Sequence, residues 1–169
     1  MKNYLSLIDT NTSGNRYDVT PLFSNYDGFN ALVNDLVEQI PEGVVDMVAC
    51  IDALGFVLGT AIARKLNVGI LTIRKGGKLP VTTDTVGFID YTGLEKQLEI
   101  RQDILSEGMK VLIVDEWIET GAQINASIQL IEAQSAAVAG VVTIKMDDNE
   151  NTQHIRSKYR TIIAWENGT

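Results

Sequence analysis

The chain is poor in the residues and runs that mark several classes of protein. Its only cysteine, Cys50, lies in an apolar run, which excludes an intrachain disulfide and fits a reducing compartment. Its only histidine, His154, lies in a polar stretch, and no Cys/His spacing indicates a zinc site. No window approaches about 18 uninterrupted apolar residues, and the opening residues lack the apolar core of a signal peptide. We therefore expect a cytoplasmic protein without a membrane partner.

Positive charge is also scarce. The formal net charge is −8, and no cluster of Lys and Arg could neutralise a row of phosphates, so nucleic acid is not an expected partner. A small anion held by a few local cations is compatible with this charge. The densest basic group consists of Arg74, Lys75 and Lys78 around the glycine pair 76–77.

The apolar residues follow helical and strand spacings in turn. With 169 residues, 45% of them hydrophobic, the chain is expected to form one domain over residues 1–169. Near-continuous Val/Ile runs are typical of buried parallel strands, so we predict an α/β fold with a mostly parallel sheet and helices on both faces. The expected strands are 44–50, 68–73, 98–101, 110–115, 137–146 and 160–165; the expected helices begin near 29, 56 and 124, with a short polar helix before the last strand; and 74–97 is expected to be a polar, glycine-containing stretch.

Three unusual loops follow strands in this pattern, and ligands of such sheets bind where loops leave the carboxyl ends of the strands. In the first, 50–56, Gly55 permits a tight turn and the next helix offers free amides to an anion. In the second, 73–80, the basic group could contact an anion. An ordinary strand-to-helix turn and a solvated surface turn are the alternatives for these two loops.

The third loop, in "VLIVDEWIETGAQ" (111–123), places acids beside a turn that could bind an anion. Asp115 and Glu116 could hold sugar hydroxyls or a hydrated Mg²⁺ that bridges to the ligand. The amides and hydroxyl of Thr120-Gly121-Ala122 could hold a phosphate. The alternative is a capped helix whose acids interact favourably with the positive end of the helix dipole.

Together these loops resemble a known family. The third loop is similar to the signature of type I phosphoribosyltransferases, in which an apolar strand, two acids and a Thr-Gly turn hold 5-phosphoribosyl pyrophosphate (PRPP). The resemblance is greatest to adenine phosphoribosyltransferases and follows one order over about Arg16 to Gly140. It rests on "RYDVTPLF", "IDALGFVLG", "IRKGGKLP", "YTGLEKQLEIRQDIL" and "VLIVDEWIETGAQ".

The resemblance implies a fold, a reaction and roles for matching residues. It implies the type I phosphoribosyltransferase fold with a small N-terminal hood (1–25), PRPP and a purine base as substrates, Mg²⁺ held mainly through the substrate, and a homodimer. Catalysis would involve Glu95 and Glu119, the first at the flexible loop and the second near the base. The ribose and 5′-phosphate would be bound by Asp115, Glu116, Thr120, Gly121, Ala122 and Gln123, and the pyrophosphate by Ala53, Leu54, Gly55, Arg74, Lys75 and Lys78.

Several positions depart from the family pattern. Leu54 stands where an Arg is usual, and "ETGAQ" replaces "ATGGT", so that Ala122 and Gln123 replace a glycine and a hydroxyl. A second interpretation is therefore a regulatory protein that binds PRPP or a nucleotide without transfer. Glu119 stands where the enzymes for 6-oxopurines carry an Asp, which keeps those bases as a further alternative. We expect Glu119→Ala to lower turnover more than Asp35→Ala, a change expected on a helix surface.

Overall fold

The computed structural model describes residues 2–14, 16–90 and 92–166. Among these residues, none of the helices combines the length and apolar character that crossing a membrane would need. The helices are η1 (Asn3–Leu7), α1 (Thr20–Ser24), α2 (Tyr26–Glu38), α3 (Leu54–Leu66), α4 (Ala122–Ala133) and α5 (Glu150–Lys158). The strands are β1 (Met47–Ile51), β2 (Gly69–Lys75), β3 (Thr83–Ile89), β4 (Glu95–Arg101), β5 (Lys110–Val114), β6 (Trp117–Ile118), β7 (Ala137–Thr143), β8 (Lys145–Met146) and β9 (Thr161–Ile163).

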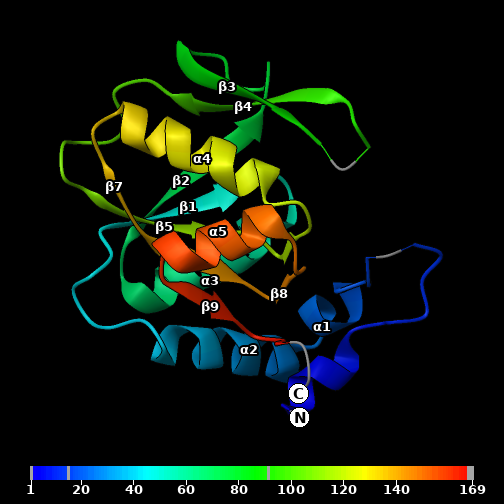
Figure 1. Cartoon of the computed structure of the whole chain (residues 1–169). Coiled ribbons are helices and arrows are strands. Elements are labelled where there is room, and N and C mark those ends of the chain that lie inside the picture. Colours follow the sequence, from blue (N-terminus) through cyan, green and yellow to red (C-terminus); the bar gives the residue numbers. More distant parts are fainter. Residues whose placement is uncertain (1, 15, 91, 167–169) are drawn as a thin grey trace.

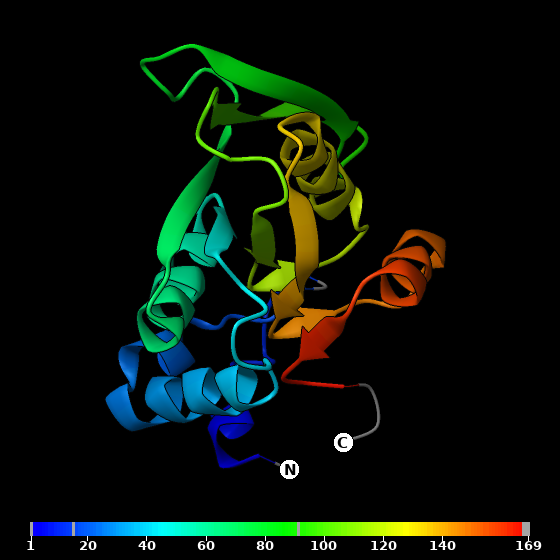
Figure 2. The same ribbon diagram turned by 90° about the vertical axis from the view of Figure 1, so that its left-hand side faces the viewer.

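A seven-stranded sheet in the order β3-β4-β2-β1-β5-β7-β9 forms the centre of the molecule (Figure 1). The neighbouring strands β2, β1, β5, β7 and β9 pair in parallel, whereas β4 pairs with β2 and β3 in antiparallel fashion. The prediction of a mostly parallel sheet is confirmed. The antiparallel β3–β4 hairpin extends from one edge of the sheet, as Figure 2 shows.

Helices cover both faces of the sheet, as the sequence predicted (Figures 1 and 2). Because successive side chains of a strand point to opposite faces, the buried residues separate into two clusters. In β1, Cys50 packs with α2 and α3, whereas Ala49 packs on the face that carries α4 and α5. The rigid sheet between these two clusters is the support for the loops at its edge.

Most expected elements occur, with three informative differences. No strand was predicted within the polar, glycine-containing stretch 74–97, but it contains β3 and the first residues of β4. Its strand signal is an alternation in which Val86 and Phe88 are partly buried between exposed neighbours. The run 137–146 divides into β7 and β8, and β8 pairs with β6 in a separate two-stranded sheet. The strand expected from Val44 begins at Met47.

Asp35 is not the plain surface position that the helical pattern suggested. Its carboxylate accepts hydrogen bonds from Lys2 Nζ, at 2.7 Å, and from the Tyr4 hydroxyl. The helical period places Asp35 on the rim of the α2 face, but only the tertiary structure brings η1 against it. Asp35 is therefore unsuitable as a neutral control for substitutions in a site.

Candidate functional site

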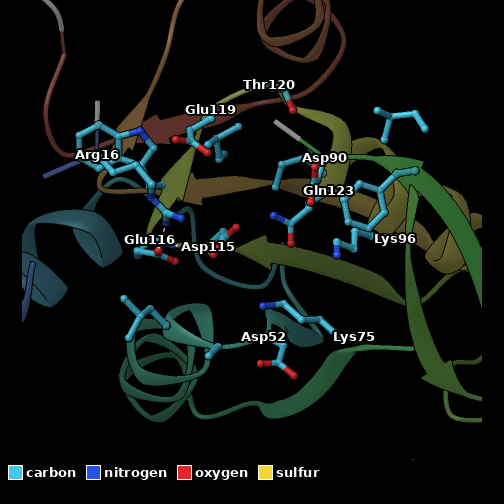
Figure 3. Close-up of a pocket in the computed structure, with 18 of the residues that line it drawn as sticks. Arg16, Asp52, Lys75, Asp90, Lys96, Asp115, Glu116, Glu119, Thr120 and Gln123 are labelled. Atoms are coloured by element: carbon cyan, nitrogen blue, oxygen red, sulfur yellow. Dashed lines mark hydrogen bonds and ion pairs between the residues drawn. The ribbon is translucent and has the colours of Figure 1, made fainter. Parts of the chain in front are cut away.

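A cleft of about 1180 Å³ opens where the loops leave the carboxyl ends of the parallel strands (Figure 3). The first loop follows β1, the second follows β2 and the third follows β5, and β2, β1 and β5 are neighbours in the sheet. Adjacency in the sheet therefore brings the three loops to one opening. The expected site residues that line the cleft are Ala53, Leu54, Lys75, Glu95, Asp115, Glu116, Glu119, Thr120, Gly121 and Gln123.

The loop after β1 supplies backbone and an apolar side chain to the cleft. Ala53 and Leu54 line it, and α3 begins at Leu54 without a side-chain cap. Gly55 does not line the cleft but allows α3 to approach β5 closely. A Cβ at Gly55 would lie 2.8 Å from the Val114 carbonyl oxygen and 3.2 Å from Asp115 Oδ1. The glycine thus has a packing role beside the acids of the third loop.

The basic residues of the second loop do not act alike. Lys75 lines the cleft, whereas Arg74 and Lys78 are not among the lining residues. The Nε atom of Arg74 donates to Asp52 Oδ2 at 3.0 Å, and its guanidinium lies 5.8 Å from the centroid of the Phe56 ring. Of the three cations in this loop, Lys75 is therefore the one placed to contact a ligand.

The acids at the end of β5 are almost fully buried. Asp115 and Glu116 are each 6% exposed, and Asp115 Oδ1 accepts a hydrogen bond from the Glu116 amide at 3.0 Å. Burial and then the neighbouring charge of Glu116 raise the pKa of Asp115 well above its usual value, while Arg16 opposes this rise. Glu116 forms an ion pair with the Arg16 guanidinium. The pair therefore connects the N-terminal segment with the end of β5.

The turn before α4 lines the cleft and ends in a glycine that cannot cap the helix with a side chain. Gly121 has φ +76°, a left-handed conformation that favours glycine, and no side chain caps the helix that begins at Ala122. On the other side, Asn149 Nδ2 donates to the Glu119 carbonyl at 2.7 Å and Asn151 Nδ2 to the Thr120 carbonyl at 3.2 Å. With its carbonyls bonded to side chains at the start of α5 and no side chain of the N-cap residue on its amides, the turn could hold an anion.

One part of this turn is already engaged. The Thr120 hydroxyl accepts a hydrogen bond of 3.3 Å from the amide of Ala122. Ala122 itself does not line the cleft, whereas Gln123 does. A ligand at the turn would thus meet the Thr120 and Gln123 side chains before the methyl group of Ala122.

Glu119 and Glu95 reach the cleft from different elements. Burial raises the pKa of the Glu119 carboxyl, Arg16 lowers it, and the charges of Asp147 and Glu116 add to the rise. Glu95 is exposed at the start of β4. A carboxyl with a raised pKa in a cleft is a better proton acceptor than an ordinary carboxyl, which suits Glu119 to acid/base chemistry.

The structure also reveals residues that motif reasoning did not assign to the site. Arg16 and Tyr17 come from the N-terminal segment, and Asp52 comes from the end of β1. The ring of Tyr17 packs edge-on against Trp117, with centroids 5.5 Å apart, which makes an aromatic wall beside Arg16. The matching segment "RYDVTPLF" was the only sequence signal for Arg16, and nothing in it indicated the partner, 100 residues away.

Comparison with known proteins gives a consistent family. Residues 24–169 match the phosphoribosyl transferase domain. The chain is 41% identical to an adenine phosphoribosyltransferase of Dinoroseobacter shibae over 123 residues, which are 73% of this chain and 68% of that protein. It is 32% identical to one of Leuconostoc citreum over 163 residues, which cover 95% and 92% of the two chains.

Solved structures agree with the sequence comparison. The adenine phosphoribosyltransferase of Thermoanaerobacter pseudethanolicus superposes with a TM-score of 0.87 at 27% identity, covering 96% of each chain. The enzyme of Saccharomyces cerevisiae, solved with an imino-altritol bisphosphate and adenine, superposes with a TM-score of 0.79 at 25% identity, covering 95% and 94%. The chain therefore belongs to the phosphoribosyltransferase family, with the type I fold found in adenine phosphoribosyltransferases.

Proposed function

We propose that this protein transfers the 5-phosphoribosyl group of PRPP to adenine, giving the nucleoside monophosphate and pyrophosphate in purine salvage. The observation that carries the proposal is the arrangement at the end of β5. There two buried acids, Asp115 and Glu116, lead into an uncapped helix start, and Lys75 lies on the same cleft. Sugar hydroxyls need acceptors, a 5′-phosphate needs amides, and pyrophosphate needs cations. The names of the relatives support adenine as the base.

In this proposal each loop binds one part of PRPP. Asp115 and Glu116 accept hydrogen bonds from the ribose hydroxyls, and the turn from Glu119 to Gln123 holds the 5′-phosphate. The backbone at Ala53 and the ammonium of Lys75 face the pyrophosphate. Arg74 and Lys78 lie farther back, so their contribution is to the electrostatic potential of the loop.

Mg²⁺ is the cofactor that this proposal includes. Within the described ranges, no three Asp, Glu, His or Cys side chains form a group that could hold a metal ion by themselves. The carboxylates of Asp115 and Glu116 are hard oxygen ligands of the kind that Mg²⁺ accepts, so they fit a hydrated ion carried mainly by the substrate. When bound, Mg²⁺ supplies positive charge that makes pyrophosphate a better leaving group.

The transfer forms a bond between N9 of the base and C1′ of the ribose, while the bond from C1′ to the pyrophosphate oxygen breaks. The imidazole proton of the base passes to a carboxylate, for which Glu119 and Glu95 are the candidates. Lys75 stabilises the negative charge that develops on the departing pyrophosphate. The raised pKa of Glu119 makes its carboxylate a better proton acceptor than an ordinary glutamate.

Glu119 also favours a second candidate, transfer to a 6-oxopurine. The carboxyl lines the cleft, where a donor on such a base could meet it. Leu54 and Gln123 depart from the family pattern, so the experiment must also test for a regulatory protein that binds PRPP without transferring its ribosyl group. The experiment is pyrophosphate release from PRPP and Mg²⁺ with adenine, hypoxanthine, guanine or xanthine, with the product confirmed by mass.

The outcomes separate these functions. Release that depends on adenine supports the proposal, and preference for a 6-oxopurine replaces adenine as the substrate. If protein that is shown to bind PRPP releases no pyrophosphate with any of the bases, the result supports the regulatory role and contradicts transfer. A homodimer, a single domain over residues 1–169 and a cytoplasmic location complete the proposal; the buried thiol of Cys50 agrees with a reducing compartment.

A further inference from the structure

Glu99 on β4 is the most buried acid in the described part of the chain, at 3% exposure. Its carboxylate accepts three backbone hydrogen bonds from the loop after β2. The donors are the amides of Gly77 at 3.0 Å, Lys78 at 2.6 Å and Leu79 at 2.7 Å. Burial alone would raise the pKa of Glu99, but these amides and Arg74 outweigh it and lower the pKa.

The three amides form the kind of concave donor surface that binds anions in many proteins. Here the chain's own carboxylate fills that surface, so these amides are not available to a substrate phosphate. The preceding amide, that of Gly76, donates to the Gln97 carbonyl at 2.9 Å, also on β4. Residues 76–79 are therefore attached to β4 through four consecutive amides.

This attachment matters because Lys75 is the cation that reaches the cleft. Lys75 is exposed, and within residues 2–14, 16–90 and 92–166 its ammonium has no carboxylate partner. Its backbone ends β2 and pairs with Leu98 of β4, and the direction of its side chain also depends on the turn that follows, where Gly77 has φ +77°. Glu99 does not itself line the cleft.

We propose that Glu99 is a positioning residue, which fixes the loop 76–79 so that Lys75 faces the pyrophosphate of PRPP. The inference rests on the proposed function and adds a residue that does not touch the substrate. A charged acceptor suits this role because charge-assisted hydrogen bonds are about twice as strong as neutral ones. A glutamine in its place would offer one acceptor oxygen and turn an amide donor toward the loop.

The test compares Glu99→Gln, Lys75→Ala and the double variant in steady-state kinetics, with Glu107→Gln as a matched change at an exposed carboxylate. We expect Glu99→Gln to raise the KM for PRPP about tenfold, which corresponds to about 1.4 kcal/mol. The kcat should fall as well, because Lys75 also stabilises the charge that develops on the departing pyrophosphate, whereas the KM for adenine should stay within about twofold. The double variant should be no worse than Lys75→Ala alone, because one residue acts through the other.

Two results would overturn this role. If the effects of the two substitutions multiply, Glu99 acts independently of Lys75. If Glu99→Gln lowers the melting temperature but leaves the KM for PRPP unchanged, the carboxylate has only a structural role. Should Glu99→Gln fail to fold, Glu99→Asp keeps the charge on a shorter side chain, and the same comparisons apply.

Binding of magnesium pyrophosphate, measured by calorimetry, separates this inference from the proposed function. Wild-type protein that binds pyrophosphate but transfers to no base contradicts the function, while weaker binding by Glu99→Gln still supports the positioning role. Hydrogen exchange adds a readout without ligand. In the wild type the amides of residues 77–79 should be protected although the turn is exposed, and Glu99→Gln should remove that protection.

Discussion

The guanidinium of Arg16 and the carboxylate of Glu116 form an ion pair between residues 100 positions apart in the chain. The glutamate side chain is 8% exposed and the arginine side chain 43%, so the pair lies at the boundary between the buried acids and solvent. Arg16 also lowers the pKa values of Asp115 and Glu119, against the larger effect of burial. One residue of the N-terminal segment thus acts electrostatically on three acids of the cleft.

Arg16→Ala should move the acid side of the pH–activity profile to higher pH. Without the cation, the pKa values of Asp115 and Glu119 rise further, so a higher pH is needed to ionise them. The measurement is kcat/KM between about pH 5 and 9, with Arg16→Lys as the variant that keeps the charge. An unchanged acid-side midpoint in Arg16→Ala would show that neither acid controls the rate.

Asp115→Asn should be more stable than the wild type at pH 7 but less active. A raised pKa means that the folded state loses stability as the pH rises from the unfolded value of 3.8 through the folded value. Asparagine carries no charge to bury. The added free energy of unfolding of Asp115→Asn should therefore be present at neutral pH and vanish below about pH 4. Each kcal/mol gained raises the melting temperature by about 2–4 °C.

The activity of Asp115→Asn tests the ribose contact at the same time. A lost hydrogen bond to a charged group is worth about 1.5–3 kcal/mol, which is roughly a 10- to 150-fold loss in kcat/KM for PRPP. Glu107→Gln, at an exposed site, should change neither property. A destabilised Asp115→Asn at pH 7 would contradict the cost assigned to the buried charge.

Glu119→Ala should lower kcat by about 10²-fold or more if this carboxyl exchanges a proton with the base. Its control is Glu38→Ala at the exposed end of α2, because Asp35 holds Lys2 and Tyr4. The measurement is kcat at saturating PRPP and base. Equal kcat values for the two variants would remove Glu119 from the chemistry and leave Glu95 as the candidate.

Gly55→Ala should destabilise the protein and displace Asp115. The added Cβ would lie 2.8 Å from the Val114 carbonyl, and such overpacking costs about 1–3 kcal/mol. Gly69→Ala is the control, since a Cβ there meets nothing within 4 Å. Urea unfolding of both variants measures the difference, and equal midpoints would show that α3 can shift without cost.

Leu54→Arg should lower the KM for PRPP by supplying a cation at the cleft. Leu54 is 39% exposed and lines the opening, so a partly solvated contact of about 1 kcal/mol, or roughly fivefold, is expected. Val57→Arg adds the same charge at a 44% exposed position of α3 that does not line the cleft. If both variants lower the KM for PRPP equally, the effect is a general electrostatic attraction of the added charge, and position 54 has no special role.

Most of the helices and strands of the sheet could be predicted from local patterns in the sequence. The Val/Ile runs of β1 and β5 and the helical spacing of α2 depend on short-range periodicity, which is readable without knowing the partners. The strand β3 was missed because its alternation is weak and lies in a polar, glycine-containing stretch. The loops after β1, β2 and β5 could be placed at one edge because parallel strands end there.

The sequence alone predicted many of the residues that line the cleft, through loops whose residue types suit an anion and a sugar. Only the tertiary structure decided which side chains face the cleft. In the folded chain Arg74 binds Asp52, whereas Lys75 lines the cleft. It also brought Arg16 to Glu116 and placed Glu99 under the basic loop. These pairings join residues distant in the chain, and their energies depend on burial and charge that no local pattern records.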